Sequence, residues 1–308
     1  MKKMFVFVII VLGLIAGAVG LGIRIKSEWE ISSKEWDGQE RIVMGLMTED
    51  EETGAILLSL EPSTESLFIM RLPSNLYMNV SRGYGKYAVK SLPALARQEL
   101  NWKLVTESLS YLIGSPVENW MVARGPFDCA EIDAKCVEKI LVKDLQRKEV
   151  ESSVNRMTRW RLAETIKRLN LKSVIVDGGS VSWKQEEMAA DGNQELTYAA
   201  DYVDARLAGK FSDKRVIDEA LAIGVVNASD RNGEAGKVGR LISGMGGRVI
   251  KLDSIKSEVD NCLIRATNQT IENSVTVRRI KEYWDCTTEV RESSGRVDVE
   301  VWIGSLLN

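Results

Sequence analysis

The chain begins with an uncharged apolar segment that is long enough to cross a lipid bilayer. Met4–Ile23 contains 20 residues without a charge, and Lys or Arg residues stand on both sides of it. At a rise of 1.5 Å per residue, 20 helical residues span about 30 Å, which is the thickness of the hydrocarbon core. We therefore predict a single-pass membrane anchor in residues 1–26, followed by a spacer in residues 27–40.

A cleaved signal peptide is the alternative interpretation of the same segment. Ala16-Gly17-Ala18 resembles a signal-peptidase site after a short apolar core. Both interpretations place the bulk of the chain outside the cytoplasm. We favour the retained anchor, which gives a cell-membrane protein whose folded part is extracytoplasmic.

Composition excludes several classes of function. The 308 residues have a net charge of −3, with acidic and basic residues interspersed, so no electrostatic surface for nucleic acid is expected. The sequence contains no histidine, which removes the usual general base and the commonest metal ligand. Any catalysis would depend on carboxylates, Lys, Arg, Ser or Cys, and we predict no cofactor.

The number and spacing of the cysteines fit an exported protein with disulfides. They stand at Cys129, Cys136, Cys262 and Cys286, and their spacing does not suit a zinc site. Sequence alone permits three connectivities. We predict two disulfides, Cys129–Cys136 within the loop 126–139 and Cys262–Cys286 near the C-terminus; reduced core thiols are the alternative.

Hydrophobic patterning predicts a mixed α/β fold in residues 41–210. Strands are expected at 41–46, 55–60, 66–72, 119–123 and 171–176. Helices are expected at 99–113 and 151–170, and a Gly- and Tyr-rich loop is expected at 81–87. The segment 184–210 is polar and Ala-rich, and we expect helix with loops there.

Beyond a boundary at 211–219 the predicted elements are short and regular. Strands are expected at 221–227, 248–252, 262–266, 286–290 and 296–303, with helices at 234–243 and 271–283. The order βαββαββ predicts a small α/β sandwich with its helices on one sheet face. Cys262 and Cys286 begin two strands that are expected to lie side by side, as a disulfide requires.

The C-terminal segment carries the motifs of a known domain. Val225-Val226-Asn227-Ala228-Ser229, Gly233-Glu234-Ala235-Gly236 and Gly247-Arg248-Val249-Ile250 follow one another in the order of a strand end, a helix start and a return strand. This segment resembles the LytR C-terminal domain. The resemblance implies a linker at 211–220 and a LytR C-terminal-like domain at 221–308.

The upstream segment resembles the LytR-CpsA-Psr catalytic domain more faintly. Ile42–Leu46 is similar to the family's first strand, and 55–62, 67–80, 83–88 and 112–122 follow in the family's order. The resemblance implies a LytR-CpsA-Psr-like domain at 41–210. Enzymes of that family transfer glycopolymers from polyprenyl-pyrophosphate carriers to the cell wall, using Arg side chains and a Mg²⁺-binding Asp.

The positions that carry this chemistry are replaced in the chain. Where the family has Asp-Thr, the sequence has Gly54-Ala55, and where it has Ile-Pro-Arg-Asp, the sequence has Leu72-Pro73-Ser74-Asn75. Ser74 lacks the guanidinium that grips a phosphate, and Gly54 and Asn75 lack the carboxylates of a Mg²⁺ site. Four cations are left as a candidate weak anion site, although a solvated basic face is the explanation we favour: Arg71, Arg82, Lys86 and Lys90.

We therefore expect a non-catalytic envelope module that binds wall polymer or a partner protein. The first alternative is a divergent glycopolymer transferase that uses Mg²⁺ and polyprenyl-pyrophosphate-linked substrates. That alternative requires carboxylates from elsewhere, such as Asp201 or Asp204. The second alternative is an unrelated scaffold with a convergent C-terminal domain.

Overall fold

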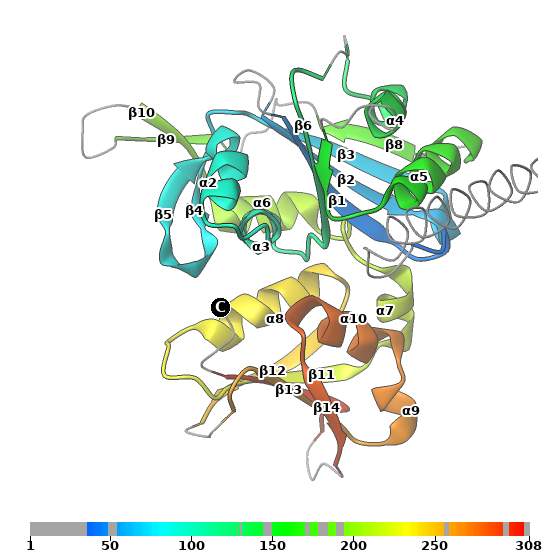
Figure 1. Ribbon diagram of the computed structural model, residues 1–308. Helices are drawn as coiled ribbons and strands as arrows, with labels where there is room; N and C mark the ends of the chain where they lie inside the picture. The colour runs from blue at the N-terminus through cyan, green and yellow to red at the C-terminus, as the bar shows by residue number, and fades with distance from the viewer. Residues whose placement is uncertain are drawn as a thin grey trace, which may run out of the picture.

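The computed structural model describes two α/β lobes, each built on its own sheet (Figure 1). The described residues are 36–48, 54–127, 129, 131–143, 150–169, 173–177, 184–188, 194–255, 259–291 and 296–304. The predicted anchor and most of the spacer lie outside these residues. Within them, no helix combines the length and apolarity needed to cross a membrane.

The N-terminal lobe contains a six-stranded sheet in the order β7-β6-β1-β2-β3-β8. Strands β1 to β3 form an antiparallel meander, β6 and β8 run parallel to β1 and β3, and β7 is antiparallel to β6. The strands are β1 (Ile42–Thr48), β2 (Ala55–Glu61), β3 (Ser66–Leu72), β6 (Asn119–Ala123), β7 (Val150–Ser152) and β8 (Ser173–Asp177). This mixed α/β architecture agrees with the prediction.

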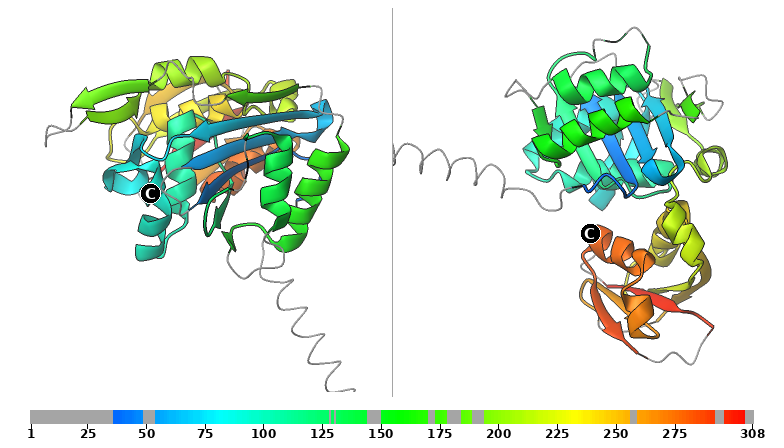
Figure 2. Two further views of the ribbon diagram at one scale, coloured as in Figure 1. Left: turned by 90° about the horizontal axis from the view of Figure 1, so that it is seen from above. Right: turned by 90° about the vertical axis from the view of Figure 1, so that its right-hand side faces the viewer.

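Helices cover both faces of this sheet, which explains why β1 and β2 are nearly continuous apolar segments. Val43, Leu57 and Met70 point to a core beneath α2, α3 and α6, while Met44, Leu58 and Ile69 point to a second core beneath α4 and α5. Figure 2 shows the helices on either side of the strands. The helices are α2 (Leu92–Gln98), α3 (Lys103–Ile113), α4 (Ala134–Lys143), α5 (Arg156–Arg168) and α6 (Ala200–Leu207).

Two hairpins flank the N-terminal sheet. Strands β4 (Tyr77–Val80) and β5 (Gly85–Ala88) form one, and β9 (Lys184–Met188) and β10 (Gln194–Tyr198) form the other. A bridge between Leu76 and Leu196 joins them. Short 3₁₀ turns stand at η1 (Pro62–Thr64), η2 (Ser81–Gly83) and η3 (Val89–Ser91).

Several sequence expectations in this lobe were wrong in part. The loop expected at 81–87 contains η2 and most of β5, and the helix expected at 99–113 begins at Lys103. Lys184–Met188 and Gln194–Tyr198 pair as a hairpin, and among the described residues of 184–210 only those of α6 are helical. The segment 126–139 is not all loop, because α4 begins at Ala134. The helix predicted at 151–170 begins at Arg156, because Asn155 caps it by accepting a hydrogen bond from Thr158 N at 2.7 Å, and β7 precedes it.

The C-terminal lobe follows the predicted order βαββαββ, except that its second helix is divided in two. Its sheet runs β12-β11-β15-β13-β14, with α8 and α10 covering one face. The expected single helix at 271–283 is two helices, because Ser274 caps a new start at α10 by accepting a hydrogen bond from Val277 N. The elements are β11 (Ala222–Asn227), α8 (Glu234–Gly244), β12 (Arg248–Ser254), β13 (Cys262–Ala266), α9 (Gln269–Glu272), α10 (Val275–Trp284), β14 (Thr287–Val290) and β15 (Val299–Ile303).

The helical face of the C-terminal lobe is turned toward the N-terminal lobe. Figure 1 shows α8 and α10 between the five-stranded sheet and the N-terminal lobe. The connecting helix α7 (Lys214–Glu219) lies beside α10, and both Glu219 oxygens accept backbone N–H groups from Val275 and Thr276 at 2.7 and 2.8 Å. A carboxylate at this helix start is favoured by the helix dipole. The helix that connects the two lobes therefore also packs on the C-terminal lobe.

Candidate functional site

Gly54 stands where the resembled family has its first carboxylate, and it has no room for a side chain. Its φ is +69°, a left-handed conformation that favours glycine. A Cβ atom on Gly54 would overlap the Leu72 carbonyl oxygen and lie 2.6 Å from Ser74 N. The start of β2 is thus packed directly on the backbone of the Leu72–Ser74 turn, and a carboxylate side chain is excluded there.

The turn itself is closed by backbone hydrogen bonds. Leu76 N donates to Pro73 O at 3.2 Å, and Lys90 N donates to Ser74 O at 3.1 Å. Ser74 is half-buried and Asn75 is exposed. Neither side chain supplies the charge that a pyrophosphate or a Mg²⁺ ion requires.

Two of the four predicted anion-site cations are paired with carboxylates. Arg82 Nε and Nη2 donate to the two Glu107 oxygens at 2.9 and 2.8 Å, and this hydrogen-bonded pairing raises the pKa of Arg82. Lys86 Nζ lies 2.9 Å from Glu195 Oε2. An anion would have to displace these acids, which come from α3 and β10.

The other two cations lie near the Leu72–Ser74 turn. Arg71 is an exposed residue of β3, directly before Leu72, and the exposed Lys90 is held beside Ser74 by its backbone. The structure therefore divides the predicted set into Arg71 and Lys90 near the turn, and Arg82 and Lys86 on the hairpin. Within the described residues, no group of three or more Cys, Asp or Glu side chains is placed to hold a metal ion.

The carboxylates that a divergent transferase would need are placed elsewhere. Asp204 accepts hydrogen bonds from Arg240 Nε at 2.6 Å and from Arg240 Nη2. Arg240 belongs to α8, so this pair joins the two lobes. Asp201 is exposed in the first turn of α6.

A buried polar cluster forms the centre of the contact between the lobes. Arg279 of α10 donates to Asp213 at 3.0 and 3.2 Å, to Glu118 at 2.9 and 3.0 Å, and to the Arg41 carbonyl at 2.7 Å. The Arg41 side chain donates in turn to Ser59 and to two carbonyls of the connecting segment. Arg41 and Arg279 are both less than a tenth exposed. Buried charges of this kind need partners, and here each has several.

The electrostatics of the cluster are set by burial and by the opposite charges. Burial opposes ionisation of Asp213, but Arg215 and Arg279 outweigh it and hold the pKa of Asp213 below its usual 3.8. Burial raises the pKa of Glu118 despite the nearby Arg279. Burial also lowers the pKa of Arg41 to about 10, which leaves it charged at neutral pH.

The two backbones also touch directly at a pair of glycines. A Cβ atom on Gly244, at the end of α8, would overlap the Gly114 carbonyl oxygen at the end of α3. Beside this contact, Tyr283 Oη lies 2.7 Å from Ser110 Oγ, and burial raises the pKa of Tyr283. The end of the helix after residue 113 was predicted from the sequence, but no sequence pattern indicated this contact or the burial of Arg41 and Arg279.

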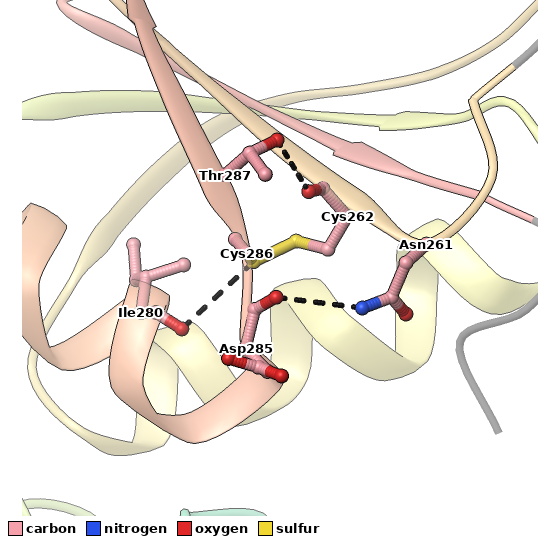
Figure 3. Close-up of a disulfide and its surroundings, with 6 residues drawn as sticks. All are labelled: Asn261, Cys262, Ile280, Asp285, Cys286 and Thr287. Atoms are coloured by element: carbon pink, nitrogen blue, oxygen red, sulfur yellow. Dashed lines mark hydrogen bonds between the residues drawn. A yellow bond between two sulfur atoms is a disulfide. The ribbon is translucent and has the colours of Figure 1, made fainter.

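The cysteines lie in two pairs at disulfide distance, Cys129–Cys136 and Cys262–Cys286, with Cα separations of 5.7 and 4.5 Å. Cys262 begins β13, and Cys286 directly precedes the adjacent parallel strand β14. Figure 3 shows this pair, with Thr287 Oγ1 donating to the Cys262 carbonyl at 3.3 Å. Both cysteines of this pair are buried, whereas Cys129 is partly exposed.

Comparison with known proteins finds similar solved structures. No family model matches the chain, and no curated protein matches it. A structure of TagT bound to LIIa-WTA has a TM-score of 0.40 and 12% identity, covering 55% of this chain and 89% of that one. A LytR-CPS2A-psr family protein, YwtF (TagT), with bound octaprenyl pyrophosphate lipid has a TM-score of 0.38 and 11% identity, with the same coverage.

A further match is TagV from B. subtilis, with a TM-score of 0.38 and 9% identity, covering 54% of this chain and 93% of that one. At these values no residue role is transferred from the matches. The solved structures similar to this chain thus include proteins of the LytR-CPS2A-Psr family, the family that its sequence motifs resemble.

Proposed function

We propose that the chain is a non-catalytic, membrane-tethered module of the cell envelope that binds wall polymer or an envelope protein. The observation that carries the proposal is the packing of Gly54 on the backbone of the Leu72–Ser74 turn. Phosphoryl-transfer chemistry depends on positioned charges at the reacting group. At this position a charged side chain has no space.

The surrounding residues support the same conclusion. Ser74 and Asn75 are uncharged, and Arg82 and Lys86 have carboxylate partners within 3 Å. Asp204, one of the two acids considered for a divergent transferase, is paired with Arg240. A catalytic role would require Arg82, Lys86 and Asp204 to leave their ion-pair partners at the same time.

Two features support an extracytoplasmic location. The apolar segment Met4–Ile23 has the length of a membrane span. The two cysteine pairs at disulfide distance fit an oxidising compartment, because disulfides persist outside the cytoplasm and are rare within it. Exported wall polymers and envelope proteins are the partners available there.

The first experiment is calorimetric titration of the full chain in detergent with a short polyprenyl pyrophosphate, with and without Mg²⁺. We expect no Mg²⁺-dependent heat. Micromolar, Mg²⁺-dependent binding, about −8 kcal/mol, would contradict the proposal and favour the divergent transferase. A catalytically active protein of the resembled family serves as the positive control.

A second experiment separates the two kinds of partner. The chain is sedimented with purified cell-wall material, before and after the wall glycopolymers are removed chemically. Loss of co-sedimentation after removal indicates polymer binding. A chain that stays in the supernatant in both cases would leave an envelope protein as the partner.

A further inference from the structure

The outer face of helices α4 and α5 is strongly basic. These two helices pack side by side on the outside of the N-terminal sheet (Figure 1). Their sequences contain eight Lys and Arg residues but only two Glu, whereas the whole chain is net negative. The exposed cations on this face are Lys135, Lys139, Arg156, Lys167 and Arg168.

An aromatic side chain and a cleft lie on the same face. Trp160 is 45% exposed, although large aromatic side chains are ordinarily covered. A cleft of about 410 Å³ is formed beside it, where α5 faces the segment that precedes β1. Its lining includes Trp160, Arg161 and Arg168 from the helix and Asp37 and Gly38 from the segment.

This face adjoins the point at which the folded part of the chain begins. Trp36 is buried in the same core as α5, and Arg161 Nη1 donates to the Trp36 carbonyl at 3.3 Å. Only residues 24–35 separate Trp36 from the apolar segment ending at Ile23. Fully extended, 12 residues span roughly 40 Å, so Trp36 and the part of α5 beside it stay within about that distance of any membrane that holds the segment.

We propose that the α4–α5 face binds an anionic lipid bilayer, with the phosphate of a lipid headgroup entering the cleft between Trp160 and Arg168. Cations near an anionic surface are attracted by about 1 kcal/mol each, and indole rings favour the headgroup region. The cleft adds a guanidinium that can hydrogen-bond a phosphate.

Acidic groups on the same face limit the attraction without reversing it. Glu164 lies 3.8 Å from Arg168, and Glu138 stands among the lysines of α4. Asp37 lines the cleft opposite the helix. On the two helices and in the cleft, five exposed cations face these three acids, which leaves a net positive charge there. The inference rests on the membrane tether of the proposed function, but not on what the rest of the chain binds.

The test uses the full chain reconstituted in lipid nanodiscs of phosphatidylcholine, with or without phosphatidylglycerol. Headgroup spin-labelled lipid quenches tryptophan at the bilayer surface, and the signal of Trp160 is the difference between the wild type and Trp160→Phe. We expect Trp160 quenching in the anionic discs, weakened by added salt, and little in the zwitterionic discs. Equal quenching in both discs would overturn the proposal.

Charge reversal supplies the matched control. Reversing three α4–α5 cations removes about 3 kcal/mol of attraction and adds repulsion, so the docking equilibrium should fall at least on the order of 100-fold. The test variant is Lys135→Glu/Lys139→Glu/Arg168→Glu; the control, with three exposed cations of the C-terminal lobe reversed, is Lys237→Glu/Arg248→Glu/Lys251→Glu. Equal quenching in the two variants would count against the surface.

Free phosphate must be separated from lipid as the source of the anion. Glycerol phosphate is titrated into the zwitterionic discs while Trp160 fluorescence is followed. No response supports the bilayer as the ligand. A saturable response that Arg168→Glu removes would show a site for a soluble phosphate, and the lipid assignment would then be wrong. Wall sedimentation with the same variants reports separately on the proposed function.

Discussion

Arg240 and Asp204 form a two-point ion pair across the boundary between the lobes. Arg240 Nε lies 2.6 Å from one Asp204 oxygen, and Nη2 donates to the other. The two side chains are 27% and 39% exposed, so solvent screens their attraction. The pair therefore fixes how α8 lies on α6 more than it adds to stability.

Exchanging the two charges should leave the pair intact. Asp204→Arg alone places two cations together and should lower the free energy of unfolding by about 1 kcal/mol, as should Arg240→Asp alone. The double variant should recover most of that loss, measured as a double-mutant cycle in urea. Additive losses would mean that the pair does not couple the lobes. Lys214 and Asp218, an exposed pair within α7, provide a control.

Two glycines of α8 should respond in opposite directions to alanine. Gly236 has open space around its Cβ position, so Gly236→Ala should raise helix stability by about 0.5–1 kcal/mol. Gly244 lies against the Gly114 carbonyl, so Gly244→Ala must separate the lobes locally and should cost about 1–3 kcal/mol. Thermal unfolding of both variants checks this. Equal effects would show that the close contact is not maintained.

Stability should fall with acid through Asp213. Its pKa in the folded chain lies below the usual 3.8, so its contribution is complete above that value and is lost as the pH falls below it. At neutral pH, Asp213→Asn leaves Arg279 with one carboxylate fewer and should cost about 3–5 kcal/mol. Urea unfolding at a series of pH values should show a weaker acid slope in the variant.

Glu118 provides the contrasting case for the same measurement. Because burial raises its pKa, its protonated form is favoured by folding, and its contribution to stability increases as the pH falls. Glu118→Gln should therefore steepen the acid loss that Asp213→Asn weakens. Identical pH profiles for the two variants would contradict the assigned pKa directions.

Restoring an acid at Gly54 should not restore a metal site. Gly54→Asp meets both the left-handed backbone and the Leu72 carbonyl, so we expect a loss of at least about 1–3 kcal/mol without Mg²⁺ binding. Gly209→Asp is the matched control, because Gly209 also has a positive φ but nothing within 4 Å of its Cβ position. Thermal unfolding with and without Mg²⁺ compares them. Stabilisation of the Gly54 variant by Mg²⁺ would refute the closed-site interpretation.

Mild reduction should open the two disulfides in a fixed order. Cys129 is partly exposed, whereas Cys262 and Cys286 are buried, so the reductant reaches the first pair sooner. Alkylation followed by mass spectrometry should label Cys129 and Cys136 first. Loss of Cys262–Cys286 should cost about 3 kcal/mol, since it closes the longer loop. Simultaneous labelling would indicate global unfolding instead.

Apolar patterning was sufficient for the elements that form the sheets. Ser66–Leu72, Asn119–Ala123 and Cys262–Ala266 have the predicted bounds, because each is an apolar or alternating segment whose side chains meet a core. The β9 strand, Lys184–Met188, has four polar residues and no such pattern. It pairs with β10 through backbone hydrogen bonds, and these do not produce a hydropathy pattern in the sequence.

The candidate site was predictable only where a motif gave positions. Gly54 and Ser74 were identified by their place in a resembled motif, but the overlap of a Gly54 side chain with the Leu72 carbonyl depends on the folded backbone. Arg279 lies in a segment whose helix was predicted, but the sequence pattern gave no indication that its charge is buried. Its burial follows from Asp213 and Glu118, which stand 66 and 161 positions away in the sequence.

The hydrogen bond from Arg279 to the Arg41 carbonyl joins residues 238 positions apart. This separation affects the order in which the contacts of the two lobes form during folding. Arg41 directly precedes β1, the first strand of the described residues, whereas Arg279 belongs to α10, the last helix among them. A chain delivered from its N-terminus completes the first sheet long before α10 exists, and contacts so distant in sequence form last. Until then, part of the bonding around Arg41 is missing. The hydrogen bonds around Arg41 in the N-terminal lobe are therefore complete only after the C-terminal lobe has folded.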